Sequence, residues 1–442
     1  MNVANKYQNK KIAIYGMGKS GISTAKKLQT LKAKVFCWDD DIKIRKKIAK
    51  NKNFVLRKFW LNSAAPHRIE NIVVSPGIDI NKCRIKSFLN KNSKKIITDL
   101  DLFFELNKNA LIISITGTNG KSTTCKIIEK ILKTAKYNVR TVGNIGNPIL
   151  SSAHSKRKCA YVLEVSSYQL QYSKLFRSKH AAILNISPDH LERHKNMKNY
   201  TLVKSRIFLA QHSSDYSYIN SKNKYLQLVK NKFKIKKLKS KLFLINKSDY
   251  SFLLKQIESK YFESEGNFEN MVFAYKIAKN LKINEKIIIK ALKEFKGLPH
   301  RQEYVFSKKN ILCINDSKAT SFDASLQSLA NYKNIFWIVG GIPKLQDRFY
   351  LNRLSKKIIK AYIIGKHPSF FVRQIKKKIS YNISHNIRIA IQNILDDIKK
   401  IKKNKKYTIL LSPAAASFDQ FKNFEERGNL FKFLIKNNFK ND

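Results

Sequence analysis

The chain has 442 residues, of which 43% are hydrophobic and 11% aromatic, and its formal net charge is +58. This apolar content excludes wholesale disorder, and the length predicts two or three domains. No apolar run reaches the roughly 18 residues of a membrane-spanning helix, and no signal peptide is found at the start, so we expect a cytoplasmic protein without membrane insertion. Five cysteines without a CxxC pair argue against a disulfide framework or a zinc site.

The positive charge allows two interpretations. Basic proteins bind nucleic acid by releasing counterions from phosphates, so the charge is compatible with a nucleic-acid binder. However, Lys, Asn and Ile are abundant together, and all three have A/T-rich codons. A biased base composition enriches all three, whereas selection for phosphate contacts would leave Ile and Asn unchanged. We therefore expect no specific nucleic-acid partner.

Short apolar runs alternate with amphipathic stretches along almost the whole chain. Runs such as KIAIYG, LIISITG and YTILLSP are typical of buried strands. Their alternation with helical patterns predicts an α/β fold with mainly parallel sheets covered by helices. Right-handed crossovers bring the carboxyl ends of such strands to one edge of the sheet, where ligands bind. We expect three domains, at residues 1–97, 98–299 and 300–442.

The first strand leads into a glycine motif, Gly16–Gly21, which matches the GxGxxG pattern of dinucleotide-binding proteins. Asp39 and Asp40 close the next strand, about where a ribose-binding acid would lie. The motif supplies a tight turn and a helix N-terminus that faces phosphate, which serves any nucleotide diphosphate. NAD and UDP are therefore both compatible with it.

A second loop, Thr116–Thr123, has the sequence TGTNGKST between a strand and a helix. Its glycines let backbone N–H groups point at phosphate oxygens. Lys121 would reach the outer phosphates of ATP, and the Ser122 hydroxyl would hold Mg²⁺. Ile115 stands where the GxxxxGK[ST] pattern has its first glycine. The placement between strand and helix nevertheless predicts a phosphate-binding loop.

Candidate metal ligands follow two further strands. Glu164 ends the strand in YVLEVSSYQL, and Asp189 and His190 come just after the strand in AAILNISPDHLERH. Each of them alone could be an ordinary turn or capping residue. Their shared position at the sheet edge beside a phosphate loop favours a Mg²⁺ site, because Mg²⁺ prefers a few oxygen ligands.

Three segments of the last domain carry small, hydroxyl and charged residues after apolar strands. They are Gly297–Glu303 (GLPHRQE), Asn315–Thr320 (NDSKAT) and Leu411–Phe421 (LSPAAASFDQF). Small residues after strands bring backbone donors close to a carboxylate. Lys318 and Lys344 would add positive charge for an acidic substrate, although most lysines in so basic a chain are solvated surface residues.

Together these motifs resemble the Mur ligases, from Gly16 to about Phe431, and the last two segments resemble the members that add D-glutamate. The resemblance implies a Rossmann-like N-terminal domain for the uridine nucleotide, a central P-loop ATPase domain and a Rossmann-like C-terminal domain for the amino acid. It thereby reassigns the glycine motif from NAD to UDP. The implied reaction joins D-glutamate to UDP-N-acetylmuramoyl-L-alanine with ATP, through an acyl phosphate, in peptidoglycan precursor synthesis.

The resemblance also implies roles at matching positions. The implied ATP contacts are Gly117, Thr118, Asn119, Gly120, Lys121, Ser122, Thr123, Asn270, Arg301 and Asp316. The implied substrate contacts are Gly16, Gly18, Lys19, Ser20, Asp39, Gly77, Asn144, Ser166, Gln169, Lys318, Thr320, Lys344, Ser417, Phe418 and Phe424. Two Mg²⁺ ions are implied, with ligands Ser122, Glu164, His190 and Lys204, the last as a carbamylated lysine. The implied catalytic residues are Lys121, Glu164, His190 and Lys204.

Two positions depart from the family pattern. Gly266 stands where a histidine is common, and Ser321 replaces the asparagine that often follows SKAT. The first puts a nucleotide contact in doubt, and the second weakens the D-glutamate assignment.

Three other hypotheses stay open. The chain could be a Mur-type ligase with another amino acid or acceptor, including a folate. It could be an NAD-dependent oxidoreductase, which would leave TGTNGKST without a role, or a nucleic-acid-stimulated ATPase. We expect a monomer.

Overall fold

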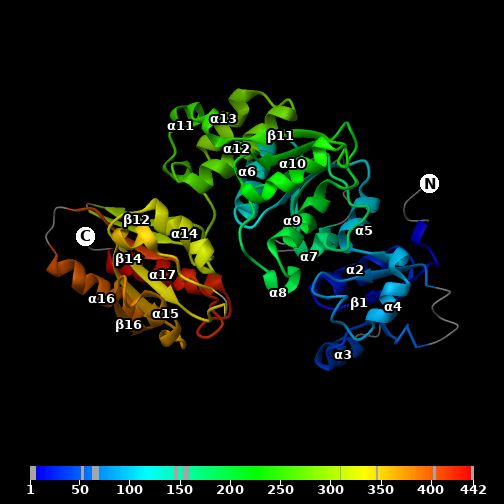
Figure 1. Cartoon of the computed structure of the whole chain (residues 1–442), viewed down its shortest axis with the longest axis horizontal. Helices are drawn as coiled ribbons and strands as arrows, with labels where there is room; N and C mark the ends of the chain where they lie inside the picture. Colours follow the sequence, from blue (N-terminus) through cyan, green and yellow to red (C-terminus); the bar gives the residue numbers. More distant parts are fainter. Residues whose placement is uncertain are drawn as a thin grey trace. The chain divides into compact units, whose positions relative to one another are not determined.

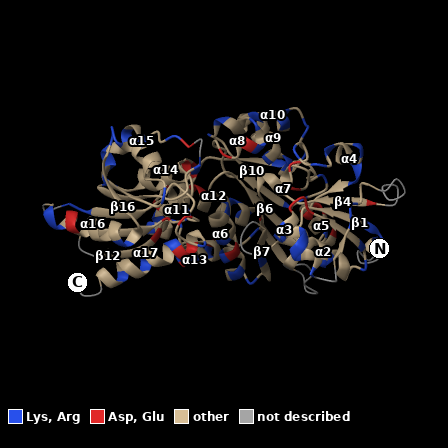
Figure 2. Ribbon diagram, turned by 90° about the horizontal axis from the view of Figure 1, so that it is seen from below, with Lys and Arg blue, Asp and Glu red and all other residues tan. Residues whose placement is uncertain are grey.

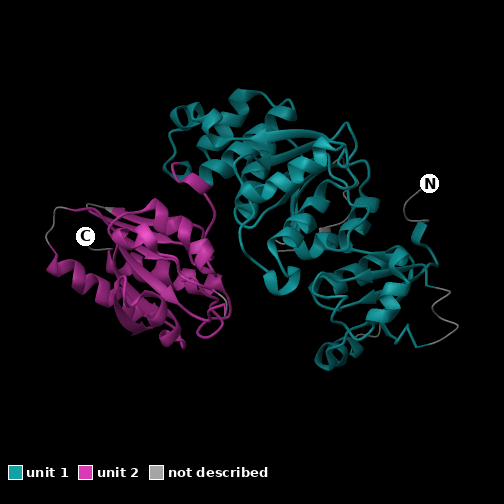
Figure 3. Cartoon of the chain, viewed as in Figure 1, with its two compact units in different colours: residues 1–262, 267–295 teal, residues 263–266, 296–442 magenta. Residues whose placement is uncertain are grey.

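The computed structural model describes residues 6–50, 54–61, 69–143, 148–152, 159–308, 310–344, 347–401 and 405–439. Within these ranges the strands form three sheets, of five, six and six strands (Figure 1). Contacts divide the chain into two compact units, one of residues 1–262 and 267–295 and one of residues 263–266 and 296–442 (Figure 3). The first unit contains two of the sheets, so the boundary expected at residue 97 lies inside it and stays a prediction.

The first sheet is parallel and has the order β3-β2-β1-β4-β5. Its strands are β1 (Lys11–Tyr15), β2 (Lys34–Trp38), β3 (Val55–Leu56), β4 (Asn71–Val74) and β5 (Ile96–Ile97). Its helices are α2 (Lys19–Thr30), α3 (Ile42–Ala49) and α4 (Lys86–Lys91). The central strand β1 is buried over four of its five residues, which is typical of a parallel strand covered on both faces. The glycine motif lies between β1 and α2.

The second sheet is also parallel and has the order β11-β10-β9-β6-β8-β7. Its strands are β6 (Leu111–Thr116), β7 (Val139–Gly143), β8 (Ala160–Glu164), β9 (His180–Ile183), β10 (Tyr216–Asn220) and β11 (Lys241–Ile245). Its helices are α5 (Asp99–Leu106), α6 (Lys121–Thr134), α7 (Ser167–Leu170), α8 (Leu191–His194), α9 (Met197–Ser205), α10 (Gln227–Lys234), α11 (Phe252–Ile257), α12 (Glu265–Asn280) and α13 (Glu285–Lys293). The phosphate loop joins β6 to α6, as the sequence predicts.

The third sheet has the order β12-β13-β17-β14-β15-β16, and only the pair of β12 and β13 is antiparallel among the described strands. Its strands are β12 (Glu303–Lys308), β13 (Ile311–Asn315), β14 (Ile335–Gly340), β15 (Ile358–Ile364), β16 (Ser380–His385) and β17 (Tyr407–Leu411). Its helices are α14 (Phe322–Asn331), α15 (Pro368–Ile375), α16 (Ile387–Lys400) and α17 (Phe424–Asn438). Three mainly parallel sheets confirm the predicted α/β class.

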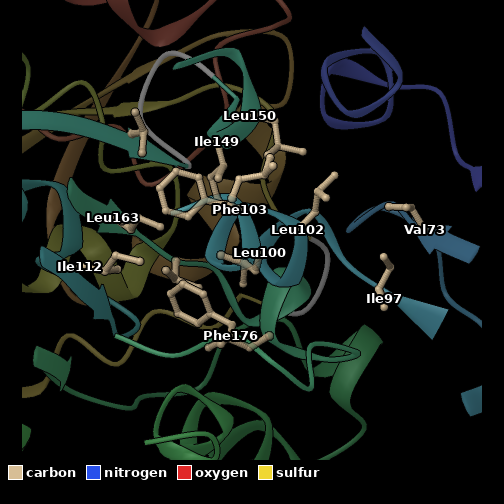
Figure 4. Close-up of a cluster of buried hydrophobic side chains, with 14 of the residues drawn as sticks. Val73, Ile97, Leu100, Leu102, Phe103, Ile112, Ile149, Leu150, Leu163 and Phe176 are labelled. Atoms are coloured by element: carbon tan, nitrogen blue, oxygen red, sulfur yellow. The ribbon is translucent and has the colours of Figure 1, made fainter. Parts of the chain in front are cut away.

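A continuous apolar core joins the two sheets of the first unit. Figure 4 shows side chains of α5, among them Phe103, between Val73 and Ile97 of the first sheet and Ile112 and Leu163 of the second. The ring of Phe103 packs edge-on against Tyr161, with ring centroids 5.1 Å apart. Because α5 is buried on nearly all sides, it carries apolar residues around most of its circumference.

A buried carboxylate fixes the start of α5. Asp101 is 1% exposed, and its Oδ2 accepts hydrogen bonds from the backbone N–H and the hydroxyl of Thr98, both at 3.0 Å. Its Oδ1 accepts from the Ser173 hydroxyl at 2.7 Å and from three successive backbone N–H groups at 2.8–3.0 Å, those of residues 174–176. One side chain thus caps the helix and holds the loop that precedes β9.

The charge is distributed over both units. Figure 2 shows Lys and Arg on many helices, including α10 in the first unit and α16 in the second. A distribution of Lys and Arg over both units is what a biased base composition predicts. Within the described residues, no helix combines the length and the hydropathy needed to cross a membrane.

His180 is a buried imidazole at the start of β9. Its ring stacks on Tyr216 with centroids 4.8 Å apart, and its Nδ1 lies 2.9 Å from the Tyr218 hydroxyl. Burial, aided by the nearby Lys179 ammonium, lowers the pKa of His180 to about 3. The folded protein therefore keeps this imidazole neutral at pH values where the unfolded chain protonates it.

We predict that His180→Phe makes the stability of the protein less sensitive to acid. The His180 imidazole binds a proton below pH ~6.5 in the unfolded chain but only near pH 3 in the folded protein. Because of this residue, the wild type should lose about 3 kcal/mol of unfolding free energy between pH 6.5 and 4. Urea unfolding across that range measures the difference, and the variant should lose less. The exposed imidazole of His212 offers a control, since His212→Asn should keep the wild-type slope. Equal slopes for wild type and His180→Phe would contradict the prediction.

Candidate functional site

The phosphate loop depends on two glycines with positive φ. Gly117 has φ +156° and Gly120, which caps α6, has φ +82°. A Cβ at Gly120 would overlap with the side-chain oxygen of Asn270. Asn270 also accepts a hydrogen bond from the Thr124 hydroxyl at 3.2 Å, so this predicted ATP contact packs directly on the loop and its helix. Only glycine fits at residue 120.

The loop is clamped by the chain that follows β9. The Thr118 N–H donates to the Asn185 carbonyl at 3.0 Å, and the Asn119 N–H donates to the Asn185 side chain at 2.9 Å. The Ser187 N–H in turn donates to the Thr118 hydroxyl at 3.1 Å. The loop conformation is therefore held by neighbouring residues of the protein itself, which prepares it for a phosphate ligand.

A hydroxyl and a carboxylate of the predicted Mg²⁺ site are in contact. The Ser122 hydroxyl donates to Glu164 Oε2 at 2.5 Å, and the two residues are only 6% and 3% exposed. They meet because β6 and β8 are adjacent, with Ile115 opposite Glu164. Ser122 and Thr123 belong to the first turn of α6, whose N–H groups and dipole favour an anion.

Two lysines meet at one carbonyl of the loop. Lys121 Nζ donates to the carbonyls of Gly117 at 3.0 Å and Thr118 at 2.7 Å. Lys204 Nζ, on α9, donates to the same Gly117 carbonyl at 2.8 Å and lies 4.8 Å from the centroid of the Tyr200 ring. Lys204 is 2% exposed, and burial together with the Lys121 charge lowers its pKa well below the usual range.

His190 lies at the start of α8 in a left-handed conformation, with φ 53°. Its Nδ1 is 3.1 Å from the Tyr168 hydroxyl, and its Nε2 is 3.3 Å from a carboxylate oxygen of Asp189. These contacts hold the imidazole ring in place, but His190 remains partly exposed to solvent. The nearby His194 is buried against the Ser167 hydroxyl, and burial lowers its pKa to about 4.

The described residues contain no ready-made cluster of three or more His, Cys, Asp or Glu side chains for a metal. The oxygen pair of Ser122 and Glu164 nevertheless fits one Mg²⁺, because this ion uses one or two protein oxygens together with phosphate oxygens and waters. A second ion fits less well. His190 offers a ring nitrogen, but an ammonium at Lys204 offers no lone pair and repels a cation.

The glycine motif of the first sheet is a tight turn with a short hydrogen-bond network. Asp39 Oδ2 accepts from the Met17 N–H at 2.6 Å, and the Ser75 hydroxyl donates to the Gly16 carbonyl at 2.6 Å. The buried Asp39 carboxylate therefore holds the loop itself. Gly18, Lys19 and Gly77 are exposed, and Ser20 is half-buried.

Ser166 and Gln169 follow Glu164 at the end of β8 and form a capping box at the start of α7. Both therefore lie at the same edge of the second sheet as the phosphate loop. Asn144, the other predicted acceptor contact of this domain, lies outside the described residues.

Arg193 is not among the site residues predicted from the sequence. Its Nη1 donates to the Gly77 carbonyl at 3.4 Å and its Nη2 to the Ile78 carbonyl, while its guanidinium lies 5.4 Å from the centroid of the Tyr168 ring. It links a predicted uridine loop to the tyrosine that contacts His190. The signal was present in the NISPDHLERH motif, but an arginine among 88 basic residues does not stand out.

In the second unit, Asp316 is buried among hydroxyls at the end of β13. It accepts from the Ser328 hydroxyl at 2.5 Å, the Ser412 hydroxyl at 3.0 Å and the Gln302 N–H at 3.2 Å. Burial raises the pKa of Asp316 to about 6. This carboxylate fastens α14 and β17 to β13, and Arg301 next to it is half-buried.

The other predicted residues of the second unit lie after its strands. Lys318 Nζ is 3.7 Å from the centroid of the Phe424 ring, a close cation–π contact. Ser417 is buried and Thr320 half-buried, whereas Lys344 is exposed and Phe418 is 70% exposed. Ser321, the departure from the family pattern, caps α14 by accepting from the Ala324 N–H at 3.4 Å.

Comparison with known proteins finds relatives over nearly the whole chain. Residues 115–288 match the Mur ligase middle domain, and residues 10–97 match the MurD-like N-terminal domain of Mur ligases. A UDP-N-acetylmuramoylalanine--D-glutamate ligase of Rickettsia felis is 35% identical, with 98% of each chain covered. The Wolbachia pipientis protein of the same name is 31% identical over 98% of this chain and 97% of its own.

Solved structures share the fold. A MurF ligase of Thermotoga maritima in complex with ADP superposes with a TM-score of 0.57 at 14% identity, covering 99% of this chain and 98% of that one. A pseudomurein peptide ligase type C of Methanothermus fervidus gives 0.51 at 18% identity, covering 92% and 97%. At these identities the likeness concerns the fold, and it confirms the predicted three-domain α/β architecture.

We predict that Gly120→Ala lowers both the melting temperature and the affinity for ATP, because the new Cβ meets Asn270 and the residue must keep a positive φ. The expected loss of unfolding free energy is about 1–3 kcal/mol. Thermal unfolding and titration with a fluorescent ATP analogue measure the two effects. Gly18→Ala is the matched control for stability, since its Cβ would meet no atom within 4 Å. Wild-type ATP binding by Gly120→Ala would contradict this account of the loop.

Proposed function

The chain belongs to the Mur ligase family, and we propose that it joins D-glutamate to UDP-N-acetylmuramoyl-L-alanine while ATP is cleaved to ADP and phosphate, in peptidoglycan precursor synthesis. The observation that carries this proposal is the 35% identity to a D-glutamate ligase across 98% of both chains. The family also implies ATP and Mg²⁺, and the contact between Ser122 and Glu164 beside the phosphate loop suits both. The oxidoreductase hypothesis has no comparable support.

The chemistry requires activation of a carboxylate, which is a poor electrophile. An oxygen of the alanyl carboxylate attacks the γ-phosphorus of ATP and ADP leaves, which gives an acyl phosphate. The neutral amine of D-glutamate attacks the carbonyl carbon, loses a proton and expels phosphate. When bound, Mg²⁺ would neutralise phosphate charge and help align the two anions that meet in the first step.

The residues of the first unit can support that first step. Lys121 places an ammonium at the mouth of the loop, and the first turn of α6 offers N–H groups to phosphate oxygens. Ser122 and Glu164 would hold the metal. We propose that Asn270 of the first unit and Arg301 and Asp316 of the second unit assist nucleotide binding. In the second unit we also propose a D-glutamate site, formed by Thr320, Lys344, Ser417 and Phe424.

We also propose that Lys204 carries a carbamate. An ammonium with one carbonyl and one hydroxyl as hydrogen-bond partners is poorly compensated at 2% exposure. The amine adds CO₂ and releases a proton, and the resulting anion offers oxygens that could help His190 to hold a second Mg²⁺. We further propose a cytoplasmic monomer, because ATP and nucleotide-linked precursors are cytoplasmic; light scattering checks the monomer.

The proposed function is tested by phosphate release from ATP with UDP-N-acetylmuramoyl-L-alanine present and amino acids added singly. We expect release that requires both the acceptor and D-glutamate, with L-glutamate inactive. Release with another amino acid would retain the ligase chemistry and change its substrate. No release with any pair would overturn the proposal.

We predict that Lys121→Ala reduces phosphate release to background while the melting temperature stays within a few degrees of wild type. The side chain would neutralise phosphate charge, and in the protein it donates to the Gly117 and Thr118 carbonyls of the loop. Lys126→Ala, farther along the same helix, is the matched control and should keep activity. Retained turnover in Lys121→Ala would assign the loop a purely structural role.

We predict a carbamate signal at Lys204. After incubation with ¹³C-bicarbonate, the ¹³C NMR spectrum of the wild type should show a carbamate resonance that is missing in Lys204→Arg. Lys179→Arg, at a half-buried lysine of the same unit, should leave the resonance unchanged. Identical spectra for the wild type and Lys204→Arg would refute the modification.

A further inference from the structure

Arg193 joins the two sheets of the first unit. It lies in α8, three residues after His190, and its side chain is only 9% exposed. Its Nε donates to the side-chain oxygen of Gln171 at 2.8 Å, and its Nη1 and Nη2 donate to the carbonyls of Gly77, at 3.4 Å, and of Ile78. The N–H donors of a guanidinium lie in one rigid plane, so a single side chain holds several acceptors in a fixed arrangement.

A second contact joins the same two parts of the unit. The hydroxyl of Tyr172 accepts a hydrogen bond from the Ile80 N–H at 3.0 Å, and the Tyr172 ring centroid lies 6.0 Å from the Arg193 guanidinium. Arg193 Nε is also 3.9 Å from a carboxylate oxygen of Asp79. Residues 77–80, which follow β4 of the first sheet, are therefore held by the second sheet's domain through two backbone carbonyls, a backbone N–H and a carboxylate.

The segment that Arg193 holds packs on the glycine motif of the first sheet. Ile78 lies against Gly16, where an added Cβ would come 2.7 Å from Ile78 Cγ1. The shape of the turn is fixed separately, because Asp39 Oδ2 accepts from the Met17 N–H at 2.6 Å. Loss of the Arg193 side chain should therefore keep the turn intact and change where it lies relative to the second sheet.

At its other end, Arg193 is joined to His190. Its backbone N–H donates to the His190 carbonyl at 3.1 Å. Its guanidinium lies 5.4 Å from the centroid of the Tyr168 ring, whose hydroxyl is 3.1 Å from His190 Nδ1. The apolar core around α5 joins the two sheets as a whole, whereas Arg193 joins loops that follow their strands, and ligands bind at this edge of parallel sheets.

We propose that Arg193 is a positioning residue for the acceptor substrate: it sets the distance between the glycine motif and His190, so that a UDP-linked substrate held at the motif places its far carboxylate at the phosphate loop. The inference rests on the proposed function and adds a residue to it. A ligand that occupies one of the two sites does not depend on this distance, but a ligand that spans both does. UDP alone and ATP alone are therefore the reference ligands for UDP-N-acetylmuramoyl-L-alanine.

Two substitutions separate the planar donor group of Arg193 from its charge. Arg193→Met removes both, whereas Arg193→Lys keeps the charge without the planar group. Calorimetry should show that each weakens binding of UDP-N-acetylmuramoyl-L-alanine by roughly tenfold, while the affinities for UDP and for ATP stay within about twofold of wild type. KM should rise for the acceptor and not for ATP. Wild-type affinity in Arg193→Lys would mean that the charge attracts the diphosphate directly, and it would overturn the positioning role.

Tyr172→Phe tests the second contact with a smaller change, since only a hydroxyl is removed. It should weaken acceptor binding by roughly threefold. Arg177→Met is the matched control, because this guanidinium donates to the Asp215 carboxylate at 2.7 and 3.1 Å, before β9 instead of after it. The control should have a lower melting temperature and an unchanged affinity for the acceptor.

Unchanged acceptor affinity in Arg193→Met or in Tyr172→Phe, or an equal loss for UDP and for the acceptor, would overturn the inference. A wild type that binds the acceptor without acceptor-dependent phosphate release would fail as the proposed ligase only, and the comparison of affinities would still decide the role of Arg193. A wild type that binds no acceptor would overturn both.

Discussion

Two ammonium groups that share one carbonyl oxygen determine how the site can work. Lys121 and Lys204 both donate to the Gly117 carbonyl, at 3.0 and 2.8 Å, and the two charges repel each other in a region of low exposure. The carboxylates of Asp189 and Glu164 act in the opposite direction and raise the pKa of Lys204, but burial keeps that pKa well below its usual range. A bound phosphate would compensate Lys121, and a carbamate would reverse the sign of Lys204. The loop thus holds two adjacent cationic side chains, and a bound phosphate together with the carbamate would neutralise their excess positive charge.

Acidic residues are few in this chain, 30 against 88 Lys and Arg, yet two of them each hold several parts of the fold together. Asp101 joins a helix start to a loop through six hydrogen bonds, and Asp316 joins two strands and a helix. Both carboxylates are buried and accept hydrogen bonds, and a lysine at either position could not accept them. A composition bias toward Lys can therefore alter many surface residues, whereas Asp101 and Asp316 must stay acidic to keep their hydrogen bonds.

Much of the fold could be predicted from the sequence because its signals are local. Strand-length apolar runs between helical patterns predict parallel sheets, and a GK[ST] triplet after a strand predicts the phosphate loop that joins β6 to α6. The role of the glycine motif could not be predicted in the same way. Its acid, Asp39, binds the Met17 N–H of the loop instead of standing free for a ribose. A local pattern predicts the turn but not the partner of its side chains.

Contacts between residues far apart in the sequence could not be predicted from local sequence patterns. The pairs of Ser122 with Glu164 and of Asp101 with Ser173 join residues 42 and 72 positions apart, and both depend on which elements become neighbours. The spacing of β6 and β8 in the sheet decides the first pair, and the docking of α5 beside α7 decides the second. In the sequence, Asp101 is an ordinary acid in the first turn of a helix. Its Oδ1 acquires a role only when the fold brings the Ser173 hydroxyl and three backbone N–H groups to it, and a carboxylate is needed because its other oxygen caps the helix at the same time.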